Sequence, residues 1–146
     1  MNVSDILNRK GRQVHSVRSH DMVYDAIATM AQKNVGALVV LCEGILCGII
    51  SERDYRNKVI LKGRSSRETA VSEIMTRDVM CVTEDYSLQE CMSIMSEKKI
   101  RHLPVLDQQE RVVGIISIGD AVRSTIEAQK SEIQDLRKYI TSSYPG

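Results

Sequence analysis

Two short segments of the chain carry a serine and an aspartate at the same spacing, each directly after an aliphatic run. Gly48-Ile49-Ile50-Ser51-x-x-Asp54 matches Gly114-Ile115-Ile116-Ser117-x-x-Asp120, with five identities in seven positions. Such a run predicts a buried strand that leads straight into a helix, whose first backbone N–H groups can bind an anion beside the hydroxyl. The aspartate lies about one turn later on the same face, and its carboxylate can accept both hydroxyls of a ribose. Phosphate at the serine and sugar at the aspartate would together describe a nucleotide.

The same Ser-x-x-Asp spacing also suits a capping box, in which hydroxyl and carboxylate satisfy the backbone donors of their own helix. For one motif taken singly, this structural interpretation is the stronger one. The motif recurs, however, and each time it follows a glycine and two isoleucines. The recurrence favours ligand binding.

The two motifs belong to a longer internal repeat. A shift of 65 positions aligns residues 14–41 with residues 79–106 at seven identities, and one extra residue in the second copy then brings the motifs into register. A duplicated unit sets the architecture by itself. We therefore expect a first repeat at residues 1–66, a second at residues 67–126, and a C-terminal helical extension and tail at residues 127–146.

Both copies predict the same order of elements. A helix begins at Asp21 in the first copy and at Ser87 in the second, where Glu90 completes a capping-box pattern. Two aliphatic runs separated by polar, turn-like residues then predict a hairpin of buried strands, and a second helix begins after each motif serine. The expected strands are 37–41 and 46–50 in the first copy, and 103–106 and 112–116 in the second.

The last helix, expected at about 120–140, extends past the repeat. It carries an apolar stripe formed by Val122, Ile126, Ile133, Leu136 and Ile140. This stripe either packs back on its own domain or meets a second subunit, and the sequence favours neither alternative.

Further motifs are Ile74-Met75-Thr76, which opens the second copy, and Lys99-Ile100-Arg101-His102-Leu103-Pro104-Val105. With them, the chain resembles proteins with paired cystathionine beta-synthase (CBS) domains from Val3 to about Ile126. The resemblance implies an α/β (α+β) fold, in which tandem βαββα CBS repeats pack as a pseudo-twofold pair, here with a C-terminal helix. It also implies two adenosine-nucleotide sites in the cleft between the copies, for AMP, ADP, ATP, NAD or S-adenosylmethionine.

Carried over residue by residue, the resemblance implies that each motif completes its site with residues of the other copy. The residues of the first site are Ser51, Arg53, Asp54, Met80, Ile100, Arg101 and His102. Those of the second site are His15, Val35, Gly36, Ala37, Ser117 and Asp120. In the first, the backbone near Met80 and Ile100 would frame adenine, Asp54 would hold the ribose, and Ser51 with the basic side chains would take the phosphate.

The two implied sites differ in charge. The first copy has Gly36 and Ala37 where the second has Arg101 and His102, and the second motif has Gly119 in place of an arginine. Because a phosphate gains from each guanidinium, we expect the first site to take the more anionic ligand. The second site, lacking those cations, is expected to take an adenosine-like ligand or none. A solvated strand edge is an equal alternative for Arg101 and His102, and Lys58 is expected to be a solvated surface residue.

The composition argues against several other classes of protein. Twenty basic residues against nineteen acidic ones give a formal charge of +1, a field too weak to gather nucleic acid or an anionic membrane. The aliphatic runs are too short to cross a bilayer, and the first residues lack the pattern of a targeting segment. We expect a cytoplasmic protein without nucleic-acid or membrane partners.

The four cysteines, Cys42, Cys47, Cys81 and Cys91, form no Cys-x-x-Cys pair and have no histidine at ligand spacing. We expect ordinary buried or half-buried thiols and no metal site. Cys42 and Cys47 lie on neighbouring predicted strands and could come close. The alternative function is therefore a redox-responsive interaction module that acts through cysteines or on a thiol enzyme.

Catalysis is not expected. The sequence offers no nucleophile with an orienting base and no glycine loop of the Walker type, so we assign no catalytic residue and no catalytic cofactor. The predicted function is a regulatory module that senses energy or cofactor state by binding an adenosine nucleotide, with AMP preferred and NAD or ATP as further candidates. It would act as a homodimer on an unknown target protein in trans.

Overall fold

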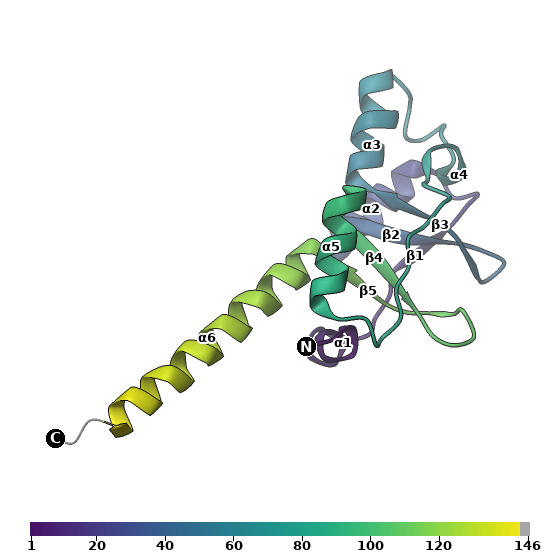
Figure 1. Cartoon of the computed structure of the whole chain (residues 1–146). Coiled ribbons are helices and arrows are strands. Elements are labelled where there is room, and N and C mark those ends of the chain that lie inside the picture. The colour runs from purple at the N-terminus through teal and green to yellow at the C-terminus, as the bar shows by residue number, and fades with distance from the viewer. Residues whose placement is uncertain (144–146) are drawn as a thin grey trace.

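The computed structural model describes residues 1–143, with side chains described up to residue 140. Two small sheets, each flanked by helices, face each other, and a long helix extends away from them (Figure 1). The first half contains β1 (Ser16–Arg18), α2 (Val23–Lys33), β2 (Ala37–Cys42), β3 (Ile45–Ser51), α3 (Glu52–Lys58) and the 3₁₀ helix η1 (Ile60–Lys62). The second contains α5 (Leu88–Lys98), β4 (His102–Leu106), β5 (Val112–Ser117) and α6 (Ile118–Ser143); α1 (Val3–Lys10) and α4 (Val71–Ile74) precede the two halves.

The predicted hairpins are confirmed, and their registers agree between the halves. Strand β2 is antiparallel to β3 and parallel to β1, while β4 is antiparallel to β5. Each motif serine lies opposite the first residue of the preceding strand, as Ala37 pairs with Ser51 and His102 with Ser117. In the second half, the counterpart of β1 is reduced to one parallel bridge between Val82 and Val105.

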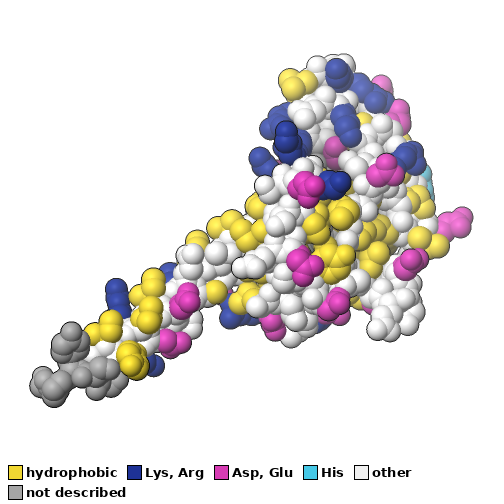
Figure 2. All heavy atoms as spheres, in the orientation of Figure 1, with side chains coloured by type: hydrophobic (Ala, Val, Ile, Leu, Met, Phe, Trp, Pro, Cys, Tyr) yellow, Lys and Arg dark blue, Asp and Glu magenta, His cyan; other side chains and the backbone are white. Residues whose placement is uncertain are grey.

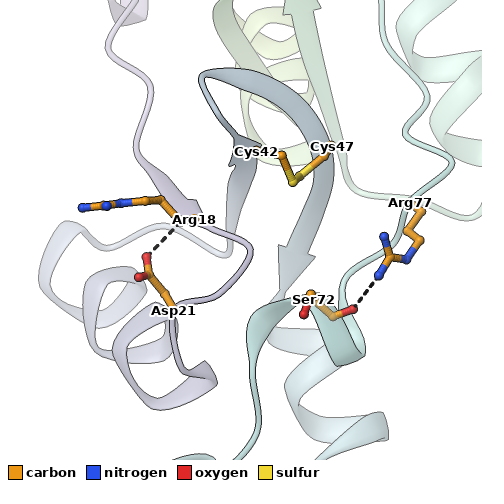
Figure 3. Close-up of a disulfide and its surroundings, with 6 residues drawn as sticks. All are labelled: Arg18, Asp21, Cys42, Cys47, Ser72 and Arg77. Carbon is orange, nitrogen blue, oxygen red and sulfur yellow. Dashed lines mark hydrogen bonds between the residues drawn. A yellow bond between two sulfur atoms is a disulfide. The ribbon is translucent and has the colours of Figure 1, made fainter.

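The starts of the two long helices in front of the hairpins differ. Ser87 caps α5 as predicted, because its hydroxyl accepts the Glu90 N–H at 3.0 Å and the Glu90 carboxylate accepts the Ser87 N–H. The prediction that Asp21 caps α2 is wrong. The Asp21 carboxylate instead accepts the Arg18 N–H at 2.9 Å and closes the turn after β1, while α2 begins at Val23 (Figure 3).

The helix that precedes each half packs into the hydrophobic core of the other half, so that the halves exchange α1 and α4. Val3, Ile6 and Leu7 of α1 are buried in the core of the second half, and Val71 and Ile74 of α4 are buried in that of the first half. Matching antiparallel bridges anchor the exchange, from Asn2 to Ser87 and from Ala70 to Met22. Packing therefore crosses the predicted boundary at residues 66 and 67, and the division into two sequence domains stays a prediction.

The glycine of each motif makes this exchange sterically feasible. A Cβ at Gly48 would lie 2.6 Å from Met75 Sδ and 3.0 Å from the Thr76 carbonyl oxygen. A Cβ at Gly114 would lie 2.8 Å from both terminal methyl carbons of Leu7. The glycines thus serve close packing of the segments that the halves exchange.

The C-terminal helix α6 begins one residue after the second motif serine and runs for 26 residues. Its first turns contact α5 and β5, and the rest extends away from both sheets (Figure 1). The side chains of the predicted stripe are exposed, from Val122 at 45% to Leu136 at 58%. The alternative that the stripe packs back on its own domain is therefore wrong. Residues 144–146 of the predicted tail lie outside the described residues.

Candidate functional site

A cleft of about 1250 Å³ lies between the two halves. It is larger than the roughly 300–1,000 Å³ of a typical single-ligand pocket. Every predicted site residue lines it: Ser51, Arg53, Asp54, Met80, Ile100, Arg101 and His102 of the first set, and His15, Val35, Gly36, Ala37, Ser117 and Asp120 of the second. The structure thus brings both sets together in one continuous cleft, and their division between two ligands stays a prediction.

Both Ser-x-x-Asp motifs form capping boxes at their helix starts. The Ser51 hydroxyl accepts the Asp54 N–H at 3.2 Å, and the Asp54 carboxylate accepts the Ser51 N–H at 3.0 Å. Ser117 and Asp120 make the same two contacts at 3.1 and 2.9 Å. The structural interpretation of the motif is therefore correct, yet the cleft in front of both motifs is open.

The capping contacts leave little of each helix start for an anion. Besides the two amides in each capping box, the Glu52 N–H donates to the Gly36 carbonyl and the Ile118 N–H donates to the Arg101 carbonyl. The expectation of several free N–H groups is therefore wrong. Two backbone N–H groups take part in none of these contacts: that of Arg53 in the first motif and that of Gly119 in the second.

The motif carboxylates are also bonded to cations. Asp54 Oδ1 lies 3.0 Å from Nζ of Lys58, whose side chain is 46% exposed, as predicted for a solvated surface residue, and forms this ion pair as well. Asp120 is bonded at 2.6 Å to both Lys10 Nζ and Arg123 Nη2. A carboxylate offers roughly four acceptor sites, and three are occupied on each aspartate. Each can therefore take one ribose hydroxyl as it stands, and a second only if a cation moves away.

Lys10 and Arg123 are two cleft cations beside the second motif that sequence reasoning missed. The second site lacks the cations of the first, as its sequence implies, but these two other cations line the cleft beside Asp120. Arg123 follows Asp120 by three residues on the same helix, so its spacing was a usable signal. Lys10 comes from α1, and only the exchange of leading helices brings it to the second motif.

The environment of Asp120 favours the charged carboxylate. Burial raises the pKa of Asp120, but the hydrogen bonds from Lys10 and from the Ser117 amide outweigh burial and lower it below its usual range. Lys10 is held in place because Nζ also donates to the Ile115 carbonyl at 2.7 Å. At neutral pH, this end of the cleft therefore contains one carboxylate between two cations.

His102 lines the cleft and lies close to the other half. A Cβ placed on Gly36 would be 3.5 Å from the imidazole, so the side chain of one half reaches the backbone of the other. Burial lowers the pKa of His102, the Asp120 carboxylate opposes that effect, and Lys10 and Arg101 add to it. His102 is therefore a neutral hydrogen-bonding group at pH 7 and adds no positive charge for a phosphate.

One cation connects the two halves directly. The Arg53 guanidinium, in the first turn of α3, donates to the carbonyl of Lys99 at the end of α5, at 2.8 Å. Lys98 and Arg101, on either side of Lys99 in the sequence, also line the cleft. A phosphate here would have these cations within reach and could draw the two halves together.

A disulfide joins Cys42 to Cys47 (Figure 3). The prediction that these two are ordinary thiols is wrong. Cys42 ends β2, and Cys47 falls between Leu46 and Gly48, where the register of the hairpin shifts, so their Cα atoms come within 5.7 Å. That separation is normal for a disulfide. Neither cysteine lines the cleft, but Cys47 lies two residues before the lining residue Ile49 on β3, roughly 7 Å away at about 3.3 Å per residue.

The other two cysteines are free thiols. Cys91 is fully buried, and burial together with the Glu90 carboxylate raises its pKa to about 11. Burial also raises the pKa of the half-buried Cys81. Both remain protonated and poorly nucleophilic at neutral pH, as the sequence predicts for buried thiols.

The described residues 1–143 bear on two other kinds of function. No helix among them has the length and hydropathy needed to cross a membrane. No group of three or more His, Cys, Asp or Glu side chains in the same part of the chain has an arrangement that could hold a metal ion.

Comparison with known proteins agrees with the fold. The model of the CBS domain family matches residues 3–60 and 71–127. The CBS domain-containing protein CBSX3, mitochondrial, of Arabidopsis thaliana is 40% identical and covers 97% of this chain, over 73% of its own length. A structure of a protein with CBS domains from Burkholderia ambifaria MC40-6 superimposes with a TM-score of 0.85 at 48% identity, over 88% of this chain and 96% of that one. The CBS domain pair of protein MJ0100, in complex with 5′-methylthioadenosine and S-adenosyl-L-methionine, has a TM-score of 0.78 at 28% identity, over 88% and 98%.

Proposed function

The chain belongs to the CBS domain family, and we propose that it is a regulatory module that binds adenosine nucleotides in the cleft between its halves. The observation that carries this proposal is the open cleft of about 1250 Å³, into which both Ser-x-x-Asp motifs face. The MJ0100 pair, which holds two adenosine compounds, supports that class of ligand. AMP is the preferred candidate, with NAD and ATP next.

The arrangement of charges supports one way of binding. In the first half of the cleft, a phosphate lies near the Arg53 guanidinium and near the backbone N–H of Arg53, which the capping contacts leave unused. Asp54 there accepts a ribose hydroxyl. In the second half, a phosphate lies near the Gly119 amide and is met by Arg123, whose side chain is 69% exposed and exchanges its bond to Asp120 for one to the phosphate. Charge-assisted hydrogen bonds of this kind stabilise a phosphate by roughly 1.5–3 kcal/mol each.

Regulation follows from the position of these groups. Ligand contacts would span α1, α3, α5 and α6, so occupancy favours one relative arrangement of the halves over another. We propose that a target protein in trans reads this arrangement, that the protein acts as a homodimer in the cytoplasm, and that it has no catalytic activity of its own. Turnover of ATP or NAD by the purified protein would contradict the last point.

A thermal-shift series tests the binding site. AMP, ADP, ATP, NAD and S-adenosylmethionine are added to wild type, Asp54→Ala, Asp120→Ala and Glu90→Ala. Glu90 is the matched control, because it plays the same capping role on α5 but is not among the residues that line the cleft. A ligand at 100 times its dissociation constant stabilises wild type by about 2.7 kcal/mol, or roughly 5–10 °C.

The proposal predicts that Glu90→Ala keeps the ligand-induced shift and that at least one aspartate variant loses it. All three variants lose roughly 0.5–2 kcal/mol of stability without ligand, because each lacks half of a capping box. The comparison therefore concerns the ligand-induced shift alone. If both aspartate variants retain the full shift, or if wild type shows none with any of these ligands, the proposed site is wrong.

The Cys42–Cys47 disulfide favours a redox-responsive module as a second candidate function. Closing so short a loop stabilises the fold by about 2 kcal/mol in the chain-entropy model. Reduction should then lower the Tm of wild type by roughly 4–8 °C. Because Cys47→Ser cannot form the disulfide, its Tm should equal that of reduced wild type, whether or not reductant is present. Because neither cysteine lines the cleft, nucleotide affinity should not change on reduction; a large change in affinity would favour the redox function.

A further inference from the structure

The exposed side chains of α6 follow a seven-residue repeat. Ile126, Ile133 and Ile140 recur at intervals of seven, which defines position a, and Val122 and Leu136 occupy position d. All five are between 45% and 58% exposed, and hydrophobic atoms follow the projecting helix in Figure 2. Apolar residues at positions a and d over successive heptads are the pattern of a left-handed coiled coil, which needs a second helix.

The residue types on this stripe indicate the number of helices. Isoleucine at position a with leucine at position d favours two parallel strands over three or four. The remaining d position within the stripe is Gln129, and one polar residue at the seam fixes register and oligomeric state at some cost in stability. A second copy of the same helix meets these requirements.

The charged residues beside the stripe indicate the direction. Glu132 occupies position g and Arg137 occupies position e, five residues later. In a parallel pair, position g of one helix faces the following position e of the other, so Glu132 faces Arg137 of the second copy, twice per dimer. In an antiparallel pair, like positions face each other, which places Glu132 opposite Glu132 and the basic Lys130 and Arg137 opposite one another. Like charges make that arrangement unfavourable.

We propose that two copies of the chain pair through α6 as a parallel two-stranded coiled coil over residues 122–140. The proposal extends beyond nucleotide binding and does not depend on it. It also has a consequence for the cleft, because Asp120 lies in the first turn of the same helix. The two clefts would then stand side by side at one end of the coiled coil, with their second motifs at its base.

Cysteine crosslinking of the full chain tests the pairing. Gln129→Cys, in a Cys81→Ser background, places thiols at a d position, where a parallel pair brings the two copies face to face. Ser131→Cys is the matched control, since position f points away from the partner. We expect mild oxidation to give a covalent dimer of the first variant in high yield and little of the second. Absence of the dimer at position 129, or equal yields from the two variants, would overturn the proposal.

Substitution of the seam tests its energetics. Ile133→Glu keeps a good helix former but buries two carboxylates in the interface, whereas Ser131→Glu adds the same charge on the outer face. The loss of two buried isoleucines should raise the dissociation constant roughly 100-fold or more, measured by sedimentation equilibrium. Added to the Gln129→Cys variant, Ile133→Glu should abolish the crosslink and Ser131→Glu should not. A crosslink that persists with Ile133→Glu would contradict a packed seam.

A charge exchange tests direction. Glu132→Lys and Arg137→Glu should each weaken their own homodimer, because each places like charges across the interface. Mixed together, they should form a heterodimer in preference to either homodimer. The side chain introduced by Glu132→Lys then faces the one introduced by Arg137→Glu, and the native pair of Glu132 and Arg137 remains on the other side. Preferential heterodimers, detected by mass spectrometry of crosslinked mixtures, support the parallel pair; random mixing would contradict it.

Discussion

The two ends of the cleft contain the same motif with different partners. At the first end, Asp54 is paired with Lys58, four residues later on its own short helix. At the second end, Asp120 is paired with Arg123 of its own helix and with Lys10, which comes from the first residues of the chain. The comparison shows that a repeated motif sets the position of a carboxylate, while the charge around it depends on which segment the fold brings alongside.

The largest expected effects on stability concern Gly48 and Gly114, which leave room for the exchanged segments to pack closely. Gly48→Ala should destabilise the protein by roughly 3 kcal/mol and Gly114→Ala by roughly 1 kcal/mol, within the range for overpacked cores. The Gly48 methyl would press on a backbone carbonyl as well as on Met75, whereas the Gly114 methyl would meet only the flexible end of Leu7. Urea denaturation of both variants measures the difference.

Two double variants test whether contacts with the exchanged side chains cause this loss of stability. Leu7→Ala creates space beside Gly114, so Gly114→Ala should become nearly neutral in the Leu7→Ala background. Met75→Ala should relieve Gly48→Ala only in part, because the Thr76 carbonyl stays in place. Full relief in both cases, or in neither, would contradict the assigned contacts.

The repeat itself could be predicted from the sequence, because the relevant signals are local. Hydrophobic runs and turn residues predicted both hairpins, and the Ser87 to Glu90 spacing predicted a cap that the structure contains. Asp21 failed as a cap because an aspartate can accept equally well from a neighbouring turn. The carboxylate joined the turn at Arg18, and nothing in the local sequence distinguishes the two outcomes.

The remaining features depend on contacts between distant parts of the chain. Lys10 and Asp120 are far apart in sequence and meet only because the halves exchange α1 and α4. The Cys42–Cys47 disulfide depends on a one-residue register shift, which alternation of polar and apolar residues does not reveal. The residues of the cleft were therefore predictable as a set, whereas the cations of the second end were not.

The next effect in size concerns the arginine at each end of the cleft. Arg53→Ala and Arg123→Ala should each weaken ATP binding roughly 10-fold at their own end, the worth of one charge-assisted bond of about 1.5 kcal/mol. Adenosine, which lacks phosphate, should lose much less. Calorimetric titrations with both ligands make the comparison. If only Arg53→Ala affects ATP, the second end does not hold phosphate, and the two ends differ as the motif sequences alone suggest.

The smallest effect concerns the lysine at each end. Lys10→Met should lower the stability of the protein by about 1 kcal/mol at pH 7, since it leaves the buried Asp120 with one cation fewer. Lys58 is more exposed, so Lys58→Met should lower it by about half as much or less.

The pH dependence of stability distinguishes the two lysine variants further. Because the folded protein holds the pKa of Asp120 below its usual value, its contribution to stability is present above pH ~4 and is lost as pH falls through the folded pKa. Removal of Lys10 raises that folded pKa towards the unfolded value, so the acid-induced loss should be smaller and should be complete at a higher pH than in wild type. Urea denaturation between pH 3 and 7 measures both quantities, and identical pH profiles for wild type and Lys10→Met would show that the Lys10 contact does not stabilise the charged carboxylate.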